Sequence, residues 1–331
     1  MDWYCNPTNH SSVDTAQLSP GSGSVGHVTF RSISVAVSLC GLVGNGTVIW
    51  FIHLSTKRNS FFTYSLNLAV VDFLHLCFQI VFSVRQILKA FLRHCFRLPG
   101  IFMVLRFFFY FTSLGVISAI SCQRCLSVLF PIWYPCHCPK HLSAIVSALL
   151  WILTFLLNIL RGHACSQLYI RKTQFCPALL AATSAWAFLL FSILGASSLL
   201  LLLRVHASSQ RHQPRKLYLV LLVSVLVFFI LGLPLSIIRF LTADVENETL
   251  NDICVLLSCT NSSANPAVYV LIGGLQRQRP REPLQVVLQR ALGEETEDGK
   301  DGKAPPPGPL KDGELPGDVC LRGMAPMISW Q

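Results

Sequence analysis

The chain has few charged residues, and acidic residues are scarcest in its middle. Of 331 residues, 13% are charged and 52% are hydrophobic, whereas soluble domains carry about 25% charged residues. Between Asp14 and Asp244 the only carboxylate is that of Asp72. A lone carboxylate excludes an intramembrane aspartyl protease, and no other catalytic group stands out, so we expect no enzyme. The composition indicates a membrane protein with several spans.

The sequence also lacks a cleavable signal, an internal repeat and a long connector between its apolar stretches. The first 29 residues contain no basic start followed by an apolar core. A transporter is expected to show repeats and paired broken helices. We therefore expect one compact helical bundle whose first span acts as its own insertion signal.

Apolar stretches of about 20 residues, the length that a helix needs to cross a bilayer, recur seven times. They lie at residues 30–54, 61–88, 99–128, 142–164, 177–205, 216–242 and 251–272. This pattern predicts an all-α membrane protein with a seven-transmembrane helix bundle over residues 30–272.

Charge around the first span predicts its orientation. No lysine or arginine occurs in the N-terminal tail (residues 1–29), whereas Lys57 and Arg58 follow the span directly. The positive-inside rule then places this tail outside the cell. Glycosylation sequons begin at Asn9 and Asn247, and an outside start with seven spans exposes both to the extracellular side.

Two further segments follow the last span. Residues 273–292 combine arginines with leucines and valines spaced for one helical face. This pattern predicts a short amphipathic helix on the inner membrane surface. Residues 293–331 are rich in proline, glycine and charge, which predicts a disordered cytoplasmic tail.

Five landmarks stand in order on the predicted spans. They are Asn45, Asp72, Trp151, Pro234 and the NPAVY sequence at 265–269. Together they resemble the rhodopsin-like G-protein-coupled receptors, which carry an asparagine, an aspartate, a tryptophan, a proline and an NPxxY motif on the first, second, fourth, sixth and seventh helices.

The closer resemblance is to the Mas-related receptors. It rests on SCQRCLSVLFPIWYPCHCPKHLSA at 121–144 and SSANPAVY at 262–269, and it covers about residues 35–292. It implies a plasma-membrane receptor that converts binding of an extracellular small molecule or peptide into activation of a heterotrimeric G protein of the Gq or Gi type. The alternative is a seven-helix partner or decoy receptor that signals weakly or not at all.

The resemblance also implies an ion site in the polar part of the last span. Pro266 removes a backbone hydrogen bond, and the amides and hydroxyls of TNSSANP can satisfy the freed carbonyls and face Asp72. In related receptors such a set holds a sodium ion with oxygen ligands. The matching residues here are Asp72, Ser113, Asn261 and Asn265. The alternative is a hydrogen-bonded polar core without an ion, and no other cofactor is expected.

The inner end of the third span departs from the usual pattern. Arg124 follows Gln123, where rhodopsin-like receptors usually carry an acidic residue. A partly buried ion pair would be worth on the order of 1 kcal/mol or more, so its loss predicts raised basal signalling. The alternative is that hydrogen bonds from Gln123 or Tyr269 restrain Arg124 equally well.

The sixth predicted span has Gly232 two residues before Pro234, where rhodopsin-like receptors usually carry a tryptophan. A bulky rotamer toggle is therefore missing, as in Mas-related receptors. Phe228 is the remaining aromatic pivot, unless it is an ordinary core residue. The switch set that the resemblance implies is Arg124, Tyr269, Pro234 and Phe228.

The thirteen cysteines are odd in number, so at least one has no intramolecular partner. By resemblance to the Mas-related pattern, Cys165 at the end of the fourth span pairs with Cys176 at the start of the fifth. Such a bridge stabilises by about 3 kcal/mol in the chain-entropy estimate. A pair of Cys95 with Cys5 or Cys254 is an alternative or additional bridge.

The outer half of the predicted bundle is basic. Arginines lie inside the outer ends of four spans, at Arg85, Arg106, Arg161 and Arg239, and four acids, Asp244, Glu246, Glu248 and Asp252, cluster on the last outer loop. Converging guanidinium groups favour carboxylate or phosphate. We therefore predict a ligand with an anionic group. The predicted contacts are Arg106, Arg161 and Arg239, with Phe107, Tyr110 and Trp186 as the apolar wall. The alternative is that some arginines snorkel to the interface or pair with the acidic loop.

Overall fold

The computed structural model of the protein describes residues 22–54, 60–92, 98–130, 134, 139, 141–168, 173–207 and 248–275. Its long elements are all helices. They are α1 (Ser22–Leu54), α2 (Ser60–Leu92), α3 (Gly100–Leu129), α5 (Leu142–Ala164), α6 (Cys176–Ala207) and α8 (Glu248–Leu275). These correspond to the first five predicted spans and the seventh. The sixth predicted span, most of the predicted amphipathic helix, residues 1–21 of the predicted N-terminal tail and the whole C-terminal tail lie outside the described residues, whereas residues 22–29 of the predicted N-terminal tail belong to α1.

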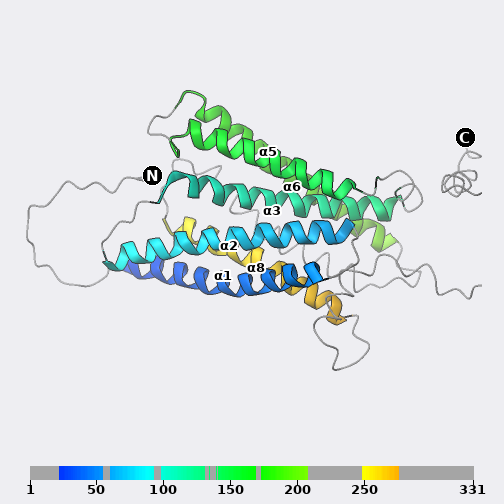
Figure 1. Ribbon diagram of the computed structural model, residues 1–331, viewed down its shortest axis with the longest axis horizontal. Coiled ribbons are helices and arrows are strands. Elements are labelled where there is room, and N and C mark those ends of the chain that lie inside the picture. The colour runs from blue at the N-terminus through cyan, green and yellow to red at the C-terminus, as the bar shows by residue number, and fades with distance from the viewer. Residues whose placement is uncertain are drawn as a thin grey trace, which may run out of the picture.

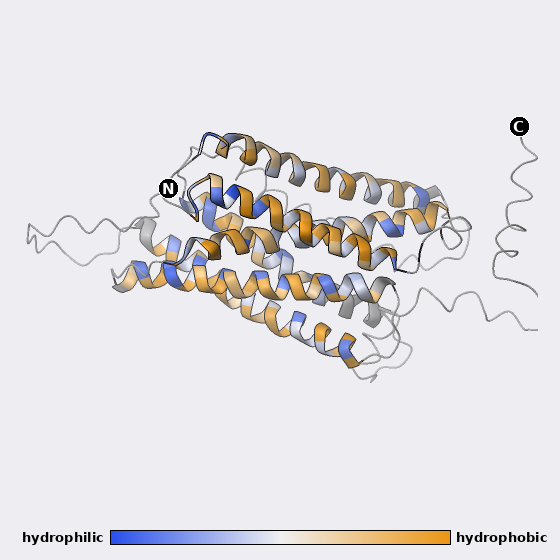
Figure 2. Ribbon diagram, turned by 45° about the horizontal axis from the view of Figure 1, so that its top comes forward, coloured by the Kyte–Doolittle hydropathy of each residue, from blue (hydrophilic) through white to orange (hydrophobic). Residues whose placement is uncertain are grey.

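Five of the described helices are long and apolar enough to cross a membrane. The qualifying segments are Val25–Leu54, Phe62–Phe91, Gly100–Leu129, Leu142–Ala164 and Cys176–Leu201. Figure 2 shows hydrophobic residues, in orange, along the helices of the bundle. From Leu142 to Leu160 of α5 the exposed positions are apolar, as at Ile152 and Leu156, while Thr154 and Asn158 are buried. This inside-out distribution is typical of helices whose outer faces meet lipid.

The helices form a bundle in which α3 packs against α2, α5 and α6, while α1 packs against α2 and α8 (Figure 1). Glycines allow close contacts between these helices. A Cβ on Gly115 of α3 would lie 3.1 Å from Leu150 of α5, and a Cβ on Gly44 of α1 would lie 3.0 Å from Pro266 of α8. Such small residues let helices approach where lipid supplies no hydrophobic drive for association. As a result, α1, α2, α3 and α8 bring their polar residues together inside the bundle.

Candidate switch core and ligand-binding site

Asp72 lies at the meeting point of three helices and is fully buried. From α3, Ser113 Oγ donates a hydrogen bond to Asp72 Oδ1 at 2.7 Å. From α8, Asn265 Nδ2 donates to Asp72 Oδ2 at 2.6 Å. Both carboxylate oxygens therefore have direct partners, and the carboxylate joins α2 to α3 and to α8.

The remaining residue of the predicted ion site, Asn261, lies on α8 about one turn before Asn265. Asn261 and its neighbour Ser262 are both buried. The residues offer carboxylate, hydroxyl and amide oxygens, which are the ligands that a hard cation such as Na⁺ prefers. The donor chemistry of this set therefore fits a sodium ion, and it fits an ion-free polar core equally well.

Pro266 lies inside α8, where it has no N–H for the carbonyl of Ser262, four residues earlier. Asn45 Nδ2 of α1 donates to this carbonyl oxygen at 3.1 Å and to that of Gly41 at 2.9 Å. From the sequence we predicted that amides and hydroxyls of the same helix would donate hydrogen bonds to the freed carbonyls. The donor to the Ser262 carbonyl instead comes from the neighbouring helix.

Further polar contacts hold the outer half of α8 against α1 and α2. His75 Nε2, one turn outward from Asp72, lies 2.8 Å from Ser258 Oγ, and Ser263 Oγ donates to the carbonyl of Val37 at 3.0 Å. The sequence analysis did not identify His75. Its spacing of three residues from Asp72 on one helix was the available signal, because positions i and i+3 share a helical face.

Asp252 corrects one prediction. The sequence analysis assigned it to the last outer loop, whereas it lies inside α8, and its side chain is 1% exposed. The Nη2 and Nε atoms of Arg31 lie 2.7 Å and 2.8 Å from its Oδ1, and His27 Nδ1 lies 2.5 Å from its Oδ2. α1 thus extends beyond the predicted start at residue 30 toward the N-terminus, and His27 in this extension contacts α8.

A basic and aromatic cluster occupies the N-terminal half of α3 and the C-terminal end of α5, which the sequence predicts to face outward. Arg106 and Arg161 are each 7% exposed. The guanidinium carbon of Arg161 lies 4.4 Å from the ring centroid of Phe107, and that of Arg106 lies 5.1 Å from the same ring and 4.8 Å from the ring of Phe82 on α2. Cation–π attraction holds guanidinium groups at such rings. Two predicted ligand contacts thus converge on one ring.

The other predicted ligand contacts lie apart from this ring or outside the described residues. Tyr110 is buried, and its ring centroid lies 5.8 Å from that of His75. Trp186 of α6 packs on a cluster that contains Leu114 and Leu190. Arg239 is outside the described residues.

At the inner end of α3, Arg124 is partly buried, and its carbonyl accepts a hydrogen bond from Ser127 Oγ at 2.9 Å. Of the other switch residues, Tyr269 belongs to α8, but its side chain is outside the described part of the structure. Phe228 and Pro234 lie outside the described residues altogether. The predicted glycosylation sites Asn9 and Asn247 are outside it as well.

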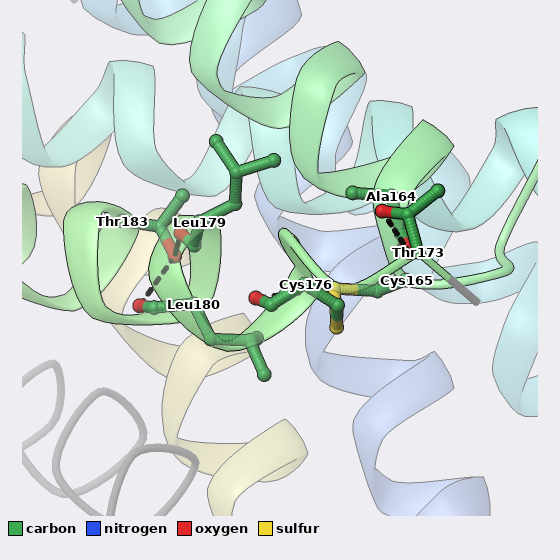
Figure 3. The surroundings of a disulfide bond; sticks show 7 residues. All are labelled: Ala164, Cys165, Thr173, Cys176, Leu179, Leu180 and Thr183. Carbon is green, nitrogen blue, oxygen red and sulfur yellow. Dashed lines mark hydrogen bonds between the residues drawn. A yellow bond between two sulfur atoms is a disulfide. The ribbon is translucent and has the colours of Figure 1, made fainter.

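The predicted disulfide is confirmed. Cys165 and Cys176 are bonded, with their Cα atoms 4.9 Å apart, and the bridge links the end of α5 to the start of α6 (Figure 3). Thr173, in the loop between them, donates its backbone N–H to the carbonyl of Ala164 at 2.9 Å. The bridge lies four residues from Arg161, so it fixes the outer end of the helix that carries this arginine.

Comparisons with known proteins agree with the resemblance found in the sequence. The family model described as "7 transmembrane receptor (rhodopsin family)" matches residues 44–269. Among curated proteins, Mas-related G-protein coupled receptor member B2 of Mus musculus is 37% identical over 278 residues, covering 82% of each chain. Member X2 of Homo sapiens is 41% identical over 265 residues, covering 77% of this chain and 80% of its own. Member X2 of Mus musculus is 36% identical over 306 residues, or 90% and 85% of the two chains.

Proposed function

Because the chain belongs to the Mas-related G-protein-coupled receptors of the rhodopsin family, we propose that it converts binding of an extracellular anionic ligand into activation of a heterotrimeric G protein. The family is one of multi-pass plasma-membrane receptors and not of enzymes. The observation that carries the proposal is the Asp72 core, in which one buried carboxylate joins α2 to α3 and α8. A contact that joins three helices can have two stable arrangements between which a ligand selects.

The proposed topology places seven spans in the membrane. Residues 216–242 and α8 add the sixth and seventh spans to the five apolar helices. The N-terminal tail, predicted at residues 1–29 and shortened by the start of α1 at Ser22, is extracellular, residues 273–292 lie on the inner surface, and residues 293–331 are cytoplasmic. The asymmetry of lysine and arginine around the first span supports this orientation, and glycans at Asn9 and Asn247 would then face outward.

The anionic ligand class is supported by the two arginines at Phe107. Both guanidinium groups are buried in the outer half of the bundle, where low dielectric strengthens their attraction for an anion. The planar guanidinium fork matches a carboxylate or a phosphate. Arg106 is the proposed primary contact, Arg161 and Arg239 are further contacts, and Phe107, Tyr110 and Trp186 form the apolar wall.

Alanine at Arg106 should strongly weaken the response to an anionic agonist while surface expression persists. Losing a charge-assisted contact with the ligand costs about 2 kcal/mol or more, so the concentration for half-maximal recruitment of a mini-G protein should rise at least about thirtyfold. Agonists would come from a screen of aliphatic carboxylates, alkyl phosphates, acidic peptides and amines. Lys89→Ala removes an equal charge from an exposed position at the outer end of α2 and should leave the response unchanged. A screen that returns only polycations would refute the ligand class.

The polar core is proposed to bind a sodium ion through Asp72, Ser113, Asn261 and Asn265. The proposal is supported by the burial of Asp72, Ser113 and Asn261, by the hydrogen bonds of Ser113 and Asn265 to the Asp72 carboxylate, and by the oxygen ligands of the set. In this arrangement Asn265 would exchange its direct bond with Asp72 for a shared cation. The sodium ion would then favour the inactive state, as it does in related receptors.

Gln123→Asp should lower basal signalling. The new carboxylate beside Arg124 adds an ion pair worth on the order of 1 kcal/mol, which corresponds to a decrease of about fivefold in ligand-free mini-G-protein recruitment. Gln123→Asn, which adds no charge, is the matched control. Equal ligand-free recruitment by the wild type and the Asp variant would refute the claim of raised basal activity.

The rival function is that of a partner or decoy receptor that signals weakly or not at all. Recruitment assays with mini-G proteins of the Gq and Gi types, with and without the ligand screen, distinguish the two functions. Recruitment of either type supports a signalling receptor and names its G protein. Absence of recruitment at normal surface expression supports the decoy.

A further inference from the structure

Three side chains form a charged contact between the outer ends of α1 and α8. Asp252 of α8 accepts both Arg31 contacts on Oδ1 and meets His27 Nδ1 on Oδ2. The side chains of Arg31 and Asp252 are 3% and 1% exposed, whereas that of His27 is 19% exposed. The ion pair of Arg31 and Asp252 is therefore buried inside the bundle, whereas the side chain of His27 is partly accessible to the surroundings.

This contact is the outermost in a series along α8. Further inward, Ser258 meets His75 at 2.8 Å and Asn265 donates to Asp72 at 2.6 Å. A rigid helix transmits a shift at one end to residues further along it. A shift of Asp252 relative to α1 would therefore move Asn265 relative to Asp72.

Protonation of the histidine changes the strength of the contact. α1 packs against α2 and α8. The charged groups at the outer ends of these elements are Arg31 on α1, Arg85 and Lys89 on α2, and Glu248 and Asp252 on α8. His27 lies beside these groups. Of the residue types present there, histidine is the one whose side chain ordinarily changes charge between about pH 5 and 8. A protonated His27 makes a charge-assisted hydrogen bond with the Asp252 carboxylate, which is stronger than a neutral one. The contact is therefore stronger in acid and weaker as pH rises.

We propose that Asp252 is a positioning residue that sets the place of α8 through Arg31 and His27, and that extracellular protons thereby restrain signalling. The inference rests on the proposed receptor function and on the outward orientation of this end of the bundle. A strengthened contact keeps α8 against α1 and Asn265 on Asp72. Acidification therefore favours the arrangement seen in this structure, and basal signalling falls.

The first test compares the wild type with His27→Gln, in which the amide can still donate to Asp252 but cannot gain a charge. Ligand-free mini-G-protein recruitment of the wild type should fall about fivefold between external pH of about 7.5 and 5.5, and that of His27→Gln should stay flat. His163→Gln replaces a histidine at the outer end of α5 and should keep the wild-type profile. A pH dependence that survives in His27→Gln, or one lost in His163→Gln, overturns the inference.

A second readout does not require signalling. The melting temperature of the purified receptor should rise by about 3 °C from pH 7.5 to 5.5 relative to that of His27→Gln. Equal shifts in the two proteins overturn the inference even when no recruitment is detected. If the melting temperature shifts as expected but no mini-G protein is recruited, the proposed signalling function is contradicted while the proposed contact of His27 with Asp252 is supported.

The ion pair itself is tested by single and paired substitutions. Asp252→Asn leaves the Arg31 charge buried without its counter-charge, so surface expression should fall severalfold. The pair Arg31→Met with Asp252→Leu removes both charges and should restore expression while abolishing the difference between the two pH values. A paired variant that keeps the wild-type pH profile contradicts the positioning role.

Discussion

Leucine in place of Asp72 should reduce G-protein recruitment at least tenfold, with or without agonist. The substitution leaves the buried Ser113 Oγ and the partly buried Asn265 Nδ2 without their acceptor, at a cost of about 1–3 kcal/mol for the buried group. It also removes the only described hydrogen bond between the Asn265 side chain and α2. Without that contact α8 would lack the proposed arrangement in which Asn265 is bonded to Asp72. A ligand would then have no equilibrium between two arrangements to shift.

The measurement is mini-G-protein recruitment at matched surface expression, repeated over a range of sodium concentration. Wild-type basal recruitment should fall as sodium rises, and Asp72→Leu should show no sodium effect. Ser65→Ala changes another buried polar residue of α2 without touching the core and should respond as the wild type does. Full recruitment by Asp72→Leu would contradict the role of the carboxylate, and a sodium effect that persists in this variant would contradict the ion site.

Serine at Cys165 or Cys176 should nearly abolish surface expression. The bridge closes a short loop between α5 and α6, and its loss costs about 3 kcal/mol in the chain-entropy model, a large part of the stability of a typical protein. The outer end of α5 also loses its anchor next to Arg161. The remaining receptor at the surface should therefore respond more weakly to an anionic agonist.

The control for this experiment is Cys40→Ser, because Cys40 is an exposed free thiol on α1. Its expression, measured by surface labelling, should match the wild type. The double variant Cys165→Ser with Cys176→Ser should be no worse than either single variant, since both single variants already break the same bond. Normal expression of the single variants would mean that the bridge does not support the fold.

Much of the fold could be predicted because lipid imposes a strong constraint on sequence. A helix must cover about 30 Å of hydrocarbon, so apolar runs alone mark α5 at 142–164 with the bounds that the structure gives. The position of Asp72 inside the bundle follows from the same physics, since an isolated carboxylate in lipid is too costly. The disulfide was predictable from the family pattern and not from spacing.

What could not be predicted depends on contacts between residues far apart in sequence. Arg31 and Asp252 are 221 positions apart, and each taken alone resembles a charged residue at a membrane boundary. Their pairing appears only when α1 and α8 are side by side. Asn45 was recognisable as a family landmark, but its hydrogen bond to the Ser262 carbonyl depends on how closely Gly44 lets α1 approach Pro266.

The exchange variant Asp72→Asn with Asn265→Asp tests the central claim most directly. An asparagine at 72 can still accept from Ser113 through its oxygen and donate through its amide nitrogen to an aspartate at 265, so both hydrogen bonds are retained with donor and acceptor exchanged. We expect each single variant to lose most mini-G-protein recruitment and the exchange variant to recover at least half of the wild-type level. Recruitment by the exchange variant no higher than that of the weaker single variant, at equal surface expression, would contradict a switch built on this pair.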